Sequence, residues 1–410
     1  MEDRFIPLSV PNLKGKELEY VTHAVETEWV STAGPYVMDF EAAVAKYVGV
    51  PRAVSCQSGT AGLHVALRLC GVTAGDLVIV PTLTFIAAVN PVRYQGADPV
   101  FMDCDGSLCM DPVKLRNFCE TECELRDFSS AGAGDEQKSA QGSGPFLYHK
   151  KTGRRIPALV VVHVFGNMAD MISLLEIAKE YHLKVVEDAT EALGTHYTSD
   201  PETPEPFRGA FAGTMGDIGV YSFNGNKIIT TGGGGMIVSK DEAILAHAKH
   251  LTTQAKSDEQ NFIHDEVGYN YRLTNLQAAL GLAQLEQLES FIKVKQANYE
   301  AYREALEGTP GLELLDVRPH IRSNRWFYAL CVRKPYPMTG MELIDLLKSH
   351  KIQSRPIWGL IHEQLPYEGS LTSEMTEAPR YHSEVVNLPC STSLTQEDAK
   401  YVAEVIRKGT

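Results

Sequence analysis

The most informative segment of this chain reads Tyr221-Ser-Phe-Asn-Gly-Asn-Lys-Ile-Ile-Thr-Thr-Gly-Gly-Gly-Gly235, with Lys227 at its centre. A lysine in such an apolar, β-rich stretch is costly to bury as an ammonium, so burial favours the neutral, nucleophilic amine. A neutral amine can form a Schiff base with an aldehyde. The alternative is a surface lysine before a glycine turn, and the surrounding sequence must decide between the two.

Helical and strand patterns alternate around this segment, between residues 38 and 250. Amphipathic spacing predicts helices, and short apolar runs rich in β-branched residues predict strands. The predicted helices are 38–47, 63–70, 84–94 and 172–181, and the predicted strands are 76–80, 99–103, 158–164, 183–187, 217–223 and 235–238. This alternation indicates an α/β domain with a mainly parallel sheet.

The character of the chain changes beyond Leu273. Helical patterns cover 275–294 and 296–306, and the remainder mixes a strand at 326–332 with helices at 340–349 and 396–408. We therefore expect a large α/β domain over residues 20–285 and a smaller domain made of 286–410 together with 1–19. Two stretches are expected to be loops: 129–144, a surface insertion rich in glycine, serine and alanine, and 198–206, which contains three prolines.

Composition argues against several classes of function. A net charge of −14 disfavours binding to nucleic acid or to anionic membranes. The eight cysteines show no spacing typical of a zinc site, and we expect reduced thiols that lie mostly in the core. No apolar run approaches the ~18 residues of a membrane span, and no signal peptide is visible. We expect a cytoplasmic protein that binds no metal.

Two motifs upstream of the lysine could bind a charged ligand. Ser58-Gly59-Thr60 opens a helix and places backbone N–H groups and hydroxyls at the positive end of its dipole, which is the form of a phosphate site. Glu187-Asp188 ends an apolar strand, where ligands bind in open α/β sheets. An aspartate there could keep a pyridine nitrogen protonated. Taken alone, each motif is more simply a helix N-cap.

Phe85 and His163 complete the set of side chains expected at strand ends. Phe85 could stack on a cofactor ring or lie in the core. His163 could line the site or be a satisfied core histidine. Phosphate turn, aromatic, histidine, aspartate and lysine follow one another at 58–60, 85, 163, 188 and 227. This is the order that a site for pyridoxal 5′-phosphate (PLP) requires.

The chain resembles the sugar aminotransferases of the DegT/DnrJ/EryC1/StrS family, which are PLP enzymes of the aspartate-aminotransferase fold (fold type I). The resemblance covers about residues 20–380 and implies a three-layer α/β/α large domain with a mainly parallel sheet, plus a smaller C-terminal α+β domain. It is carried by Ser58-Gly-Thr-Ala-Gly-Leu63, Pro81-Thr-Leu-Thr-Phe85, Pro99-Val-Phe-Met-Asp103, Val162-His-Val-Phe-Gly166, Glu187-Asp-Ala-Thr-Glu-Ala-Leu-Gly194, Ser222-Phe-Asn-Gly-Asn-Lys227 and Gly268-Tyr-Asn-Tyr-Arg-Leu-Thr-Asn-Leu-Gln-Ala-Ala279.

The resemblance implies a role for each of these residues. Lys227 would form the Schiff base with PLP and move a proton between substrate and cofactor, while Asp188 would pair with the pyridine nitrogen. The remaining cofactor contacts would come from Gly59, Thr60 and Ser222 at the phosphate, Phe85 on the ring, and Asn270 at the phosphate of a neighbouring subunit. A homodimer with shared active sites is therefore expected.

The sequence departs from the family pattern in two places. Glu191 stands where many relatives have glutamine facing the ring hydroxyl of the cofactor, so its contact is open. A glutamate there could be protonated or could hydrogen-bond elsewhere. The insertion at 129–144 has no counterpart in the pattern.

Two stretches resemble one branch of the family most, namely residues 222–235 and Ser354-Arg-Pro-Ile-Trp-Gly-Leu-Ile-His362. This branch aminates C4 of nucleotide-linked 4-keto-6-deoxy-N-acetylhexosamines in bacillosamine and legionaminic-acid pathways. Arg355 offers a cation for a diphosphate, and Trp358 and His362 offer flat rings for stacking. Further candidates for substrate contacts are His163, Arg322 and Arg325. The alternative for the arginines is solvated charge on a small domain.

We predict a PLP-dependent aminotransferase that takes an amino group from L-glutamate, leaving pyridoxamine phosphate and 2-oxoglutarate, and delivers it to the keto carbon of a nucleotide sugar. The product would serve bacterial surface-glycan, lipopolysaccharide or nonulosonic-acid biosynthesis. Lys227 would act as nucleophile and then as general acid/base.

Several alternatives stay open at this point. Within the family they are amination at C3 and action on another keto sugar, and the nucleotide and the choice between dimer and tetramer are not fixed. A dehydratase of the same fold would have histidine in place of Lys227. A non-catalytic nucleotide-sugar sensor would not need the intact Lys227 and Asp188. A Rossmann dehydrogenase lacks support, since no Gly-x-Gly-x-x-Gly follows the first strand.

Overall fold

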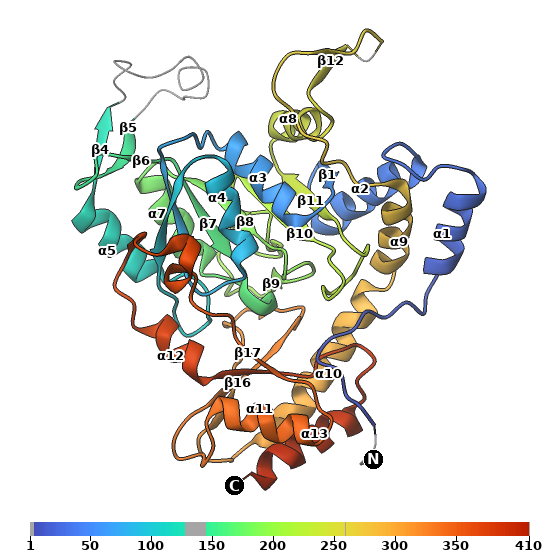
Figure 1. Ribbon diagram of the computed structural model, residues 1–410, viewed down its shortest axis with the longest axis vertical. Coiled ribbons are helices and arrows are strands. Elements are labelled where there is room, and N and C mark those ends of the chain that lie inside the picture. Colours follow the sequence, from blue (N-terminus) through green and yellow to red (C-terminus); the bar gives the residue numbers. More distant parts are fainter. Residues whose placement is uncertain (1–3, 128–144, 259, 410) are drawn as a thin grey trace.

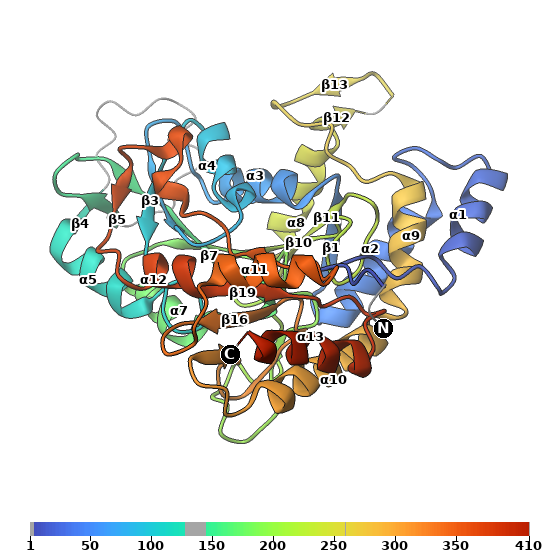
Figure 2. The same ribbon diagram turned by 60° about the horizontal axis from the view of Figure 1, so that its bottom comes forward.

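The structure is a computed structural model that describes residues 4–127, 145–258 and 260–409, and the predicted insertion at 129–144 lies outside them. A mixed eight-stranded sheet forms the centre (Figures 1 and 2). Strand β11 is antiparallel to both of its neighbours, and the other pairs are parallel. The strand order is β1 (Arg52–Cys56), β11 (Gly235–Ser239), β10 (Ile218–Ser222), β8 (Lys184–Asp188), β7 (Ala158–Val162), β2 (Leu77–Pro81), β3 (Asp98–Met102) and β18 (Leu371–Thr372).

Helices cover both faces of this sheet. Every residue of β2, β7, β10 and β11 is buried, which requires packing partners on both sides of each strand. The helices of this part are α1 (Glu17–Glu26), α2 (Pro35–Val48), α3 (Gly59–Leu69), α4 (Asn90–Tyr94), α5 (Pro112–Glu122), α7 (Met171–Glu180), α8 (Glu242–Thr252) and α9 (Asn275–Leu285). Of these, α1 packs on α9 at the outside of the molecule. The α/β fold with a mainly parallel sheet is therefore confirmed.

A second, antiparallel sheet lies below the first in Figure 1. Its order is β14 (Leu312–Leu314), β16 (Tyr328–Val332), β19 (Val385–Leu388) and β17 (Arg355–Pro356). The helices α11 (Gly340–Ser349) and α13 (Gln396–Lys408) belong to this part, together with the long α10 (Leu288–Leu306). The predicted strand at 326–332 and the helices at 340–349 and 396–408 are confirmed.

Helix α10 connects two hydrophobic cores. Phe291 near its start packs in the core of the large sheet, whereas Tyr302 near its end packs in a second core with Tyr328 and Ile6. The N-terminal residue Ile6 thus lies with the C-terminal part of the chain, and its backbone bridges Ile352. The division into domains at residue 285 stays a prediction.

Three predicted elements differ from the structure. The helix expected at 84–94 is a 3-10 turn, η1 (Ile86–Ala88), followed by the short α4, because Pro91 supplies no backbone N–H to a continuous helix. The helix expected at 275–294 is divided between α9 and α10. The strand expected at 158–164 ends at Val162, since the chain turns into η2 (Val164–Gly166), where Phe165 has a φ of 58°.

The remaining elements are short strands, 3-10 turns and one helix. They are β4 (Cys123–Asp127), β5 (Pro145–His149), β6 (Arg155–Ile156), β9 (His196–Tyr197), β12 (Lys256–Asp258), β13 (Ile263–His264), β15 (Ile321–Arg322), η3 (Ile361–Glu363), η4 (Leu365–Tyr367) and α12 (Glu377–Glu384). The β12–β13 hairpin projects from the body (Figures 1 and 2). All eight cysteines are unpaired and buried. Among the described residues, no helix is both long and apolar enough to cross a membrane.

Candidate active site

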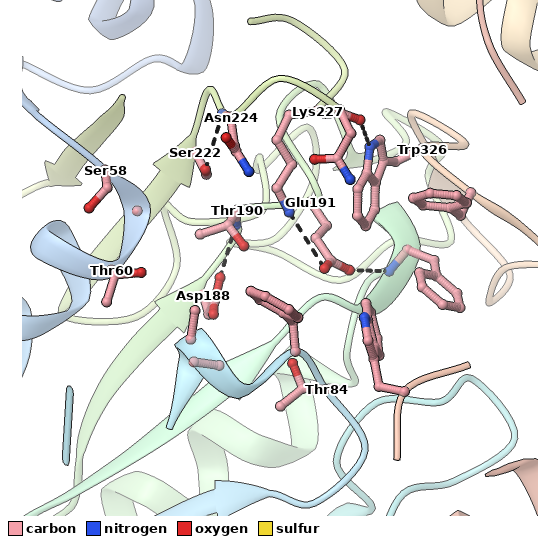
Figure 3. A pocket seen from close by; sticks show the side chains of 18 of the residues that line it. Ser58, Thr60, Thr84, Asp188, Thr190, Glu191, Ser222, Asn224, Lys227 and Trp326 are labelled. Carbon is pink, nitrogen blue, oxygen red and sulfur yellow. Dashed lines mark hydrogen bonds and ion pairs between the residues drawn. The ribbon is translucent and has the colours of Figure 1, made fainter. Parts of the chain in front are cut away.

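A cavity of about 480 Å³ lies between the large sheet and the antiparallel sheet. On one side it meets the ends of parallel strands, because Asp188 is the last residue of β8 and Ser222 the last of β10. Phe85, which follows β2, and the first residues of α3 complete this side. The convergence expected from the sequence is thus present for the aspartate, the phosphate turn and the lysine (Figure 3), and Phe85 also lines the cavity.

Lys227 lies in the loop after β10, with its side chain only 11% exposed. Its Nζ is 3.6 Å from Oε1 of Glu191 and 4.1 Å from the centre of the Trp326 ring. The indole N–H of Trp326 donates to the carbonyl of Asn226, the residue before the lysine, at 2.7 Å. The amine therefore faces the cavity in a fixed loop, and the alternative of a surface lysine is wrong.

The glycines after the lysine allow a close approach to α3. A Cβ on Gly235 would lie 2.7 Å from the carbonyl carbon of Ser58 and 2.8 Å from the nitrogen of Gly59. Only a residue without a side chain lets β11 run this close to the start of the helix. Gly235, at the end of the run of glycines, is thus required by the packing of β11 against the start of α3.

The start of α3 fits a phosphate group. Ser58 caps the helix through a bond from the N–H of Ala61 to its Oγ at 3.1 Å. The N–H groups of Gly59 and Thr60 belong to the first turn, where a helix offers no acceptor. A Cβ on Gly59 would lie within 3.0 Å of Ser222, so the glycine keeps this corner open. An anion there would meet free N–H groups and the helix dipole.

Asp188 lies at the bottom of the cavity and is 3% exposed. The N–H of Thr190 donates to its Oδ1 at 3.0 Å. Burial raises the pKa of Asp188, and the hydrogen bonds from Thr190 and the charge of Lys227 oppose the rise without cancelling it. The raised pKa indicates that the charge of Lys227 does not fully compensate the negative charge of the buried Asp188 carboxylate. A protonated pyridine nitrogen would supply one, so the residues present fit PLP.

The neighbouring acid, Glu187, points to the other side of β8 and has a structural environment. Nε2 of His163 lies 2.9 Å from its Oε2, and the N–H groups of Gly213 and Met215 donate to its two oxygens. Burial alone would raise the pKa of Glu187, but these partners outweigh burial and lower it.

His163 therefore does not lie where a substrate contact was predicted. The side chain is fully buried, and its Nδ1 accepts a hydrogen bond from the N–H of Ala169 at 3.2 Å. Both ring nitrogens are engaged, so the ring is a satisfied core histidine that anchors Glu187. The turn after Val162 carries His163 away from the cavity, and this turn was not visible in the sequence.

Three other candidates also lie outside the cavity lining. Arg325 stacks 3.6 Å over the ring of Tyr299 and pairs with Asp316. His362 bonds through Nδ1 to Oγ1 of Thr82 at 2.6 Å. Arg322 pairs with Glu289 and with the carbonyl of Gly194. Each of the three side chains thus has a protein partner, and the geometry supports none of the three predicted substrate contacts.

Arg355 and Trp358 do line the cavity, from the side of the antiparallel sheet. Arg355 is exposed and Trp358 is half-buried. Asn270 is exposed and bridges Thr253 at the base of the β12–β13 hairpin, away from the cavity of its own chain. Its predicted contact with the cofactor of a second subunit stays a prediction.

Sequence reasoning missed most of an aromatic wall opposite Phe85. Phe165 and Trp358 have ring centres 4.7 Å apart, and those of Trp326 and Phe327 are 4.3 Å apart. All four rings line the cavity. The adjacent aromatics at 326 and 327 were visible at the start of a predicted strand. Phe165 was not predictable, because its left-handed backbone turns the ring into the cavity.

Glu191, which departs from the family pattern, lies in the site. It is 3% exposed, and its Oε2 accepts a hydrogen bond from the N–H of Phe165 at 2.8 Å. Burial raises the pKa of Glu191 to about 7, although Lys227 and the Phe165 N–H act in the opposite direction. The carboxyl is therefore a group whose charge changes near neutral pH.

A lysine amine, a buried acid and a phosphate corner around one cavity of this fold are the parts of a PLP site of fold type I. Comparison with known proteins agrees. A sequence model of the DegT/DnrJ/EryC1/StrS aminotransferase family matches residues 11–124 and 148–407. The chain belongs to this family.

Similar proteins cover the chain almost completely. GDP-perosamine synthase of Caulobacter vibrioides (strain ATCC 19089 / CIP 103742 / CB 15) is 33% identical, over 96% of this chain and 95% of its own. The protein of the same name from Escherichia coli O157:H7 is 33% identical, over 99% and 98% respectively. The crystal structure of DesI in the presence of its TDP-sugar product superimposes with a TM-score of 0.81 at 26% identity, over 99% of this chain and 93% of DesI. The chain is thus a sugar aminotransferase, and PLP is its cofactor.

Proposed function

We propose that this enzyme transfers an amino group from L-glutamate to C4 of a nucleotide-linked 4-keto-6-deoxy-N-acetylhexosamine. The observation that carries this proposal is the placement of Lys227 Nζ and Asp188 on one side of the cavity, with Arg355 and the aromatic wall on the other. The names of the similar proteins, which mention GDP and a TDP-sugar, support a nucleotide sugar as substrate. The likeness of residues 354–362 to one branch of the family favours C4 and the N-acetyl group.

The residues divide the reaction among themselves. When bound, PLP supplies an aldehyde to take up the amino group and a ring that accepts electrons from the substrate carbon. Asp188 holds positive charge on the ring nitrogen, which its burial makes a strong interaction. Lys227 Nζ would remove the proton from the amino-bearing carbon of the donor and deliver it to the cofactor carbon that takes up the amino group, so that the donor leaves as a keto acid. Trp326 and the Asn226 carbonyl hold the lysine loop in place for both transfers.

The wall opposite Phe85 would bind the sugar nucleotide. Arg355 is exposed at the cavity, and among the described residues no carboxylate pairs with it, so its guanidinium is available for a diphosphate. Trp358 offers a face for stacking. The rings of Phe165 and Phe327 form an apolar surface, which suits the methyl group of a 6-deoxy sugar.

We also propose a homodimer with shared active sites. Asn270 is not among the residues that line the cavity of its own chain, and it bridges Thr253 near the hairpin that projects from the body, as expected of a residue that serves a second subunit. Mixing Asn270→Ala chains with Lys227→Ala chains tests this. Heterodimers should recover part of the activity that each homodimer lacks, and no recovery would contradict shared sites. The expected cytoplasmic location stays a prediction.

The assay for the main proposal is a single turnover of the PLP-loaded enzyme with L-glutamate. Wild-type enzyme should release 2-oxoglutarate, and Lys227→Ala should release none at a measurable rate. Equal rates would refute the role of Lys227. The charged enzyme is then offered GDP-, UDP- and TDP-linked 4-keto sugars, and the aminated carbon is read by NMR. Amination at C3 would correct the position, and a protein inert with every donor and acceptor would be a sensor.

A further inference from the structure

Glu191 has two oxygens with different partners, and this difference suggests a specific role. Its Oε2 is fixed by the N–H of Phe165 at 2.8 Å, a residue whose left-handed backbone leaves little freedom. Its Oε1 is directed at Nζ of Lys227, 3.6 Å away (Figure 3). One oxygen thus orients the carboxyl, and the other faces the nitrogen that reacts.

The surroundings of Glu191 and Lys227 strengthen the electrostatic interaction between them. The side chain of Glu191 is 3% exposed and that of Lys227 is 11% exposed, so little water screens the two charges. The charged groups acting on Glu191 are Lys227, from the loop after β10, and Asp188, at the end of β8. From the antiparallel sheet, Trp326 presents a neutral ring to the amine. The guanidinium of Arg325 is directed away, toward Asp316.

Asp188 cannot take the place of Glu191 in this interaction. As a PLP enzyme, the protein uses Asp188 for the ring nitrogen of the cofactor, and the negative charge there is compensated by that nitrogen. The carboxyl group that remains within reach of the Lys227 nitrogen is that of Glu191. Two acids therefore serve two different nitrogens of one site.

We propose that Glu191 is a positioning residue that acts through Lys227: its carboxylate is the counter-ion of the Lys227 nitrogen and stabilises positive charge there, including after the bond to PLP has formed. This inference rests on the proposed role of Lys227 as the residue that binds PLP. It assigns to Glu191 the control of the pH range in which that nitrogen stays protonated.

The test is a pH titration of the visible absorption band of the PLP-loaded enzyme, which reports the proton on the nitrogen that joins Lys227 to PLP. Glu191→Gln removes the charge but keeps an oxygen that can accept from the Phe165 N–H. An opposite charge within about 4–6 Å changes a pKa by about 1–3. The midpoint pH of the titration should therefore be lower in Glu191→Gln than in the wild type by at least about one pH unit. Glu191→Asp keeps the charge and should retain most of the wild-type value.

Two controls separate charge from structure. Glu176→Gln removes an exposed acid on α7 and should leave the midpoint unchanged. Glu191→Ala removes both the charge and the acceptor for Phe165, so its midpoint should fall as far as that of the Gln variant. An unchanged midpoint in Glu191→Gln would overturn the inference while leaving the proposed function intact. A wild-type enzyme with no band that depends on Lys227 would overturn both.

Discussion

Replacement of Asp103 by asparagine tests how the cavity wall is attached to the large sheet. Asp103 follows β3 and is fully buried. It accepts hydrogen bonds from the N–H groups of Thr376, Glu377 and Ala378 at 2.7–2.8 Å, and Lys114 pairs with it. These N–H groups belong to the start of α12, so one carboxylate caps the helix that follows the segment with Arg355 and Trp358.

The magnitude follows from the pKa of this acid. Burial alone would raise it, but the bond from Lys114 and the three N–H groups outweigh burial and lower the pKa from 3.8 to about 2. Since one pKa unit corresponds to 1.36 kcal/mol, the ionised form gains about 2 kcal/mol on folding. Asparagine resembles the protonated acid, so Asp103→Asn should lower the free energy of unfolding at pH 7 by about 2 kcal/mol.

The stabilisation by Asp103 should be lost at low pH. The pKa of Asp103 is lower in the folded than in the unfolded chain, so its stabilisation is complete above pH 3.8 and is lost as the pH falls through about 2. Urea unfolding followed by circular dichroism at pH 7 and at pH 3 measures both values, and the difference between wild type and variant should shrink at pH 3. Asp111→Asn is the matched control, because asparagine caps α5 as well as aspartate does. A loss below about 0.5 kcal/mol at pH 7, or one independent of pH, would refute this reasoning.

Three further changes test the site. Gly59→Ala places a methyl group in the phosphate corner and should weaken PLP binding about tenfold or more, as measured by absorbance titration of the apoenzyme. In the control variant Gly225→Ala the added methyl group meets open space, and PLP should bind as in the wild type. Arg355→Ala should raise the KM for the nucleotide sugar about tenfold or more without slowing the half-reaction with glutamate; Arg325→Ala should change neither, and a KM effect at Arg325 would contradict the assignment. Asp188→Asn should slow the glutamate half-reaction at least about 100-fold in stopped-flow absorbance, and a near-normal rate would contradict its role at the ring nitrogen.

The parallel strands of the sheet were predictable because each is a short apolar run rich in β-branched residues, a pattern that lies wholly within the strand itself. β7 and β8 read correctly to within about two residues. The positions of Asp188 and Lys227 followed from the same signal, since residues at the ends of parallel strands meet at one edge. Local pattern was therefore sufficient at the end of β8, but not after β7, where the turn at Val164–Gly166 carries His163 away from the cavity and brings Phe165 into it.

The antiparallel side of the site was not predictable in this way. β17 has only two residues, Arg355–Pro356, and its pairing with β19 joins segments about thirty residues apart. Arg325 and Arg355 look alike in sequence, yet the side chain of Arg325 is turned onto Tyr299 while Arg355 reaches the cavity. The direction of a side chain in such loops depends on contacts between distant segments, which no local pattern encodes.

The most direct test of the account is to find the atom that holds PLP. Borohydride reduction of the PLP-loaded enzyme fixes the cofactor to the nitrogen that binds it, and peptide mass mapping then identifies the residue. We predict a phosphopyridoxyl group on Lys227 and on no other lysine. Modification of a different lysine, or of none, would contradict it.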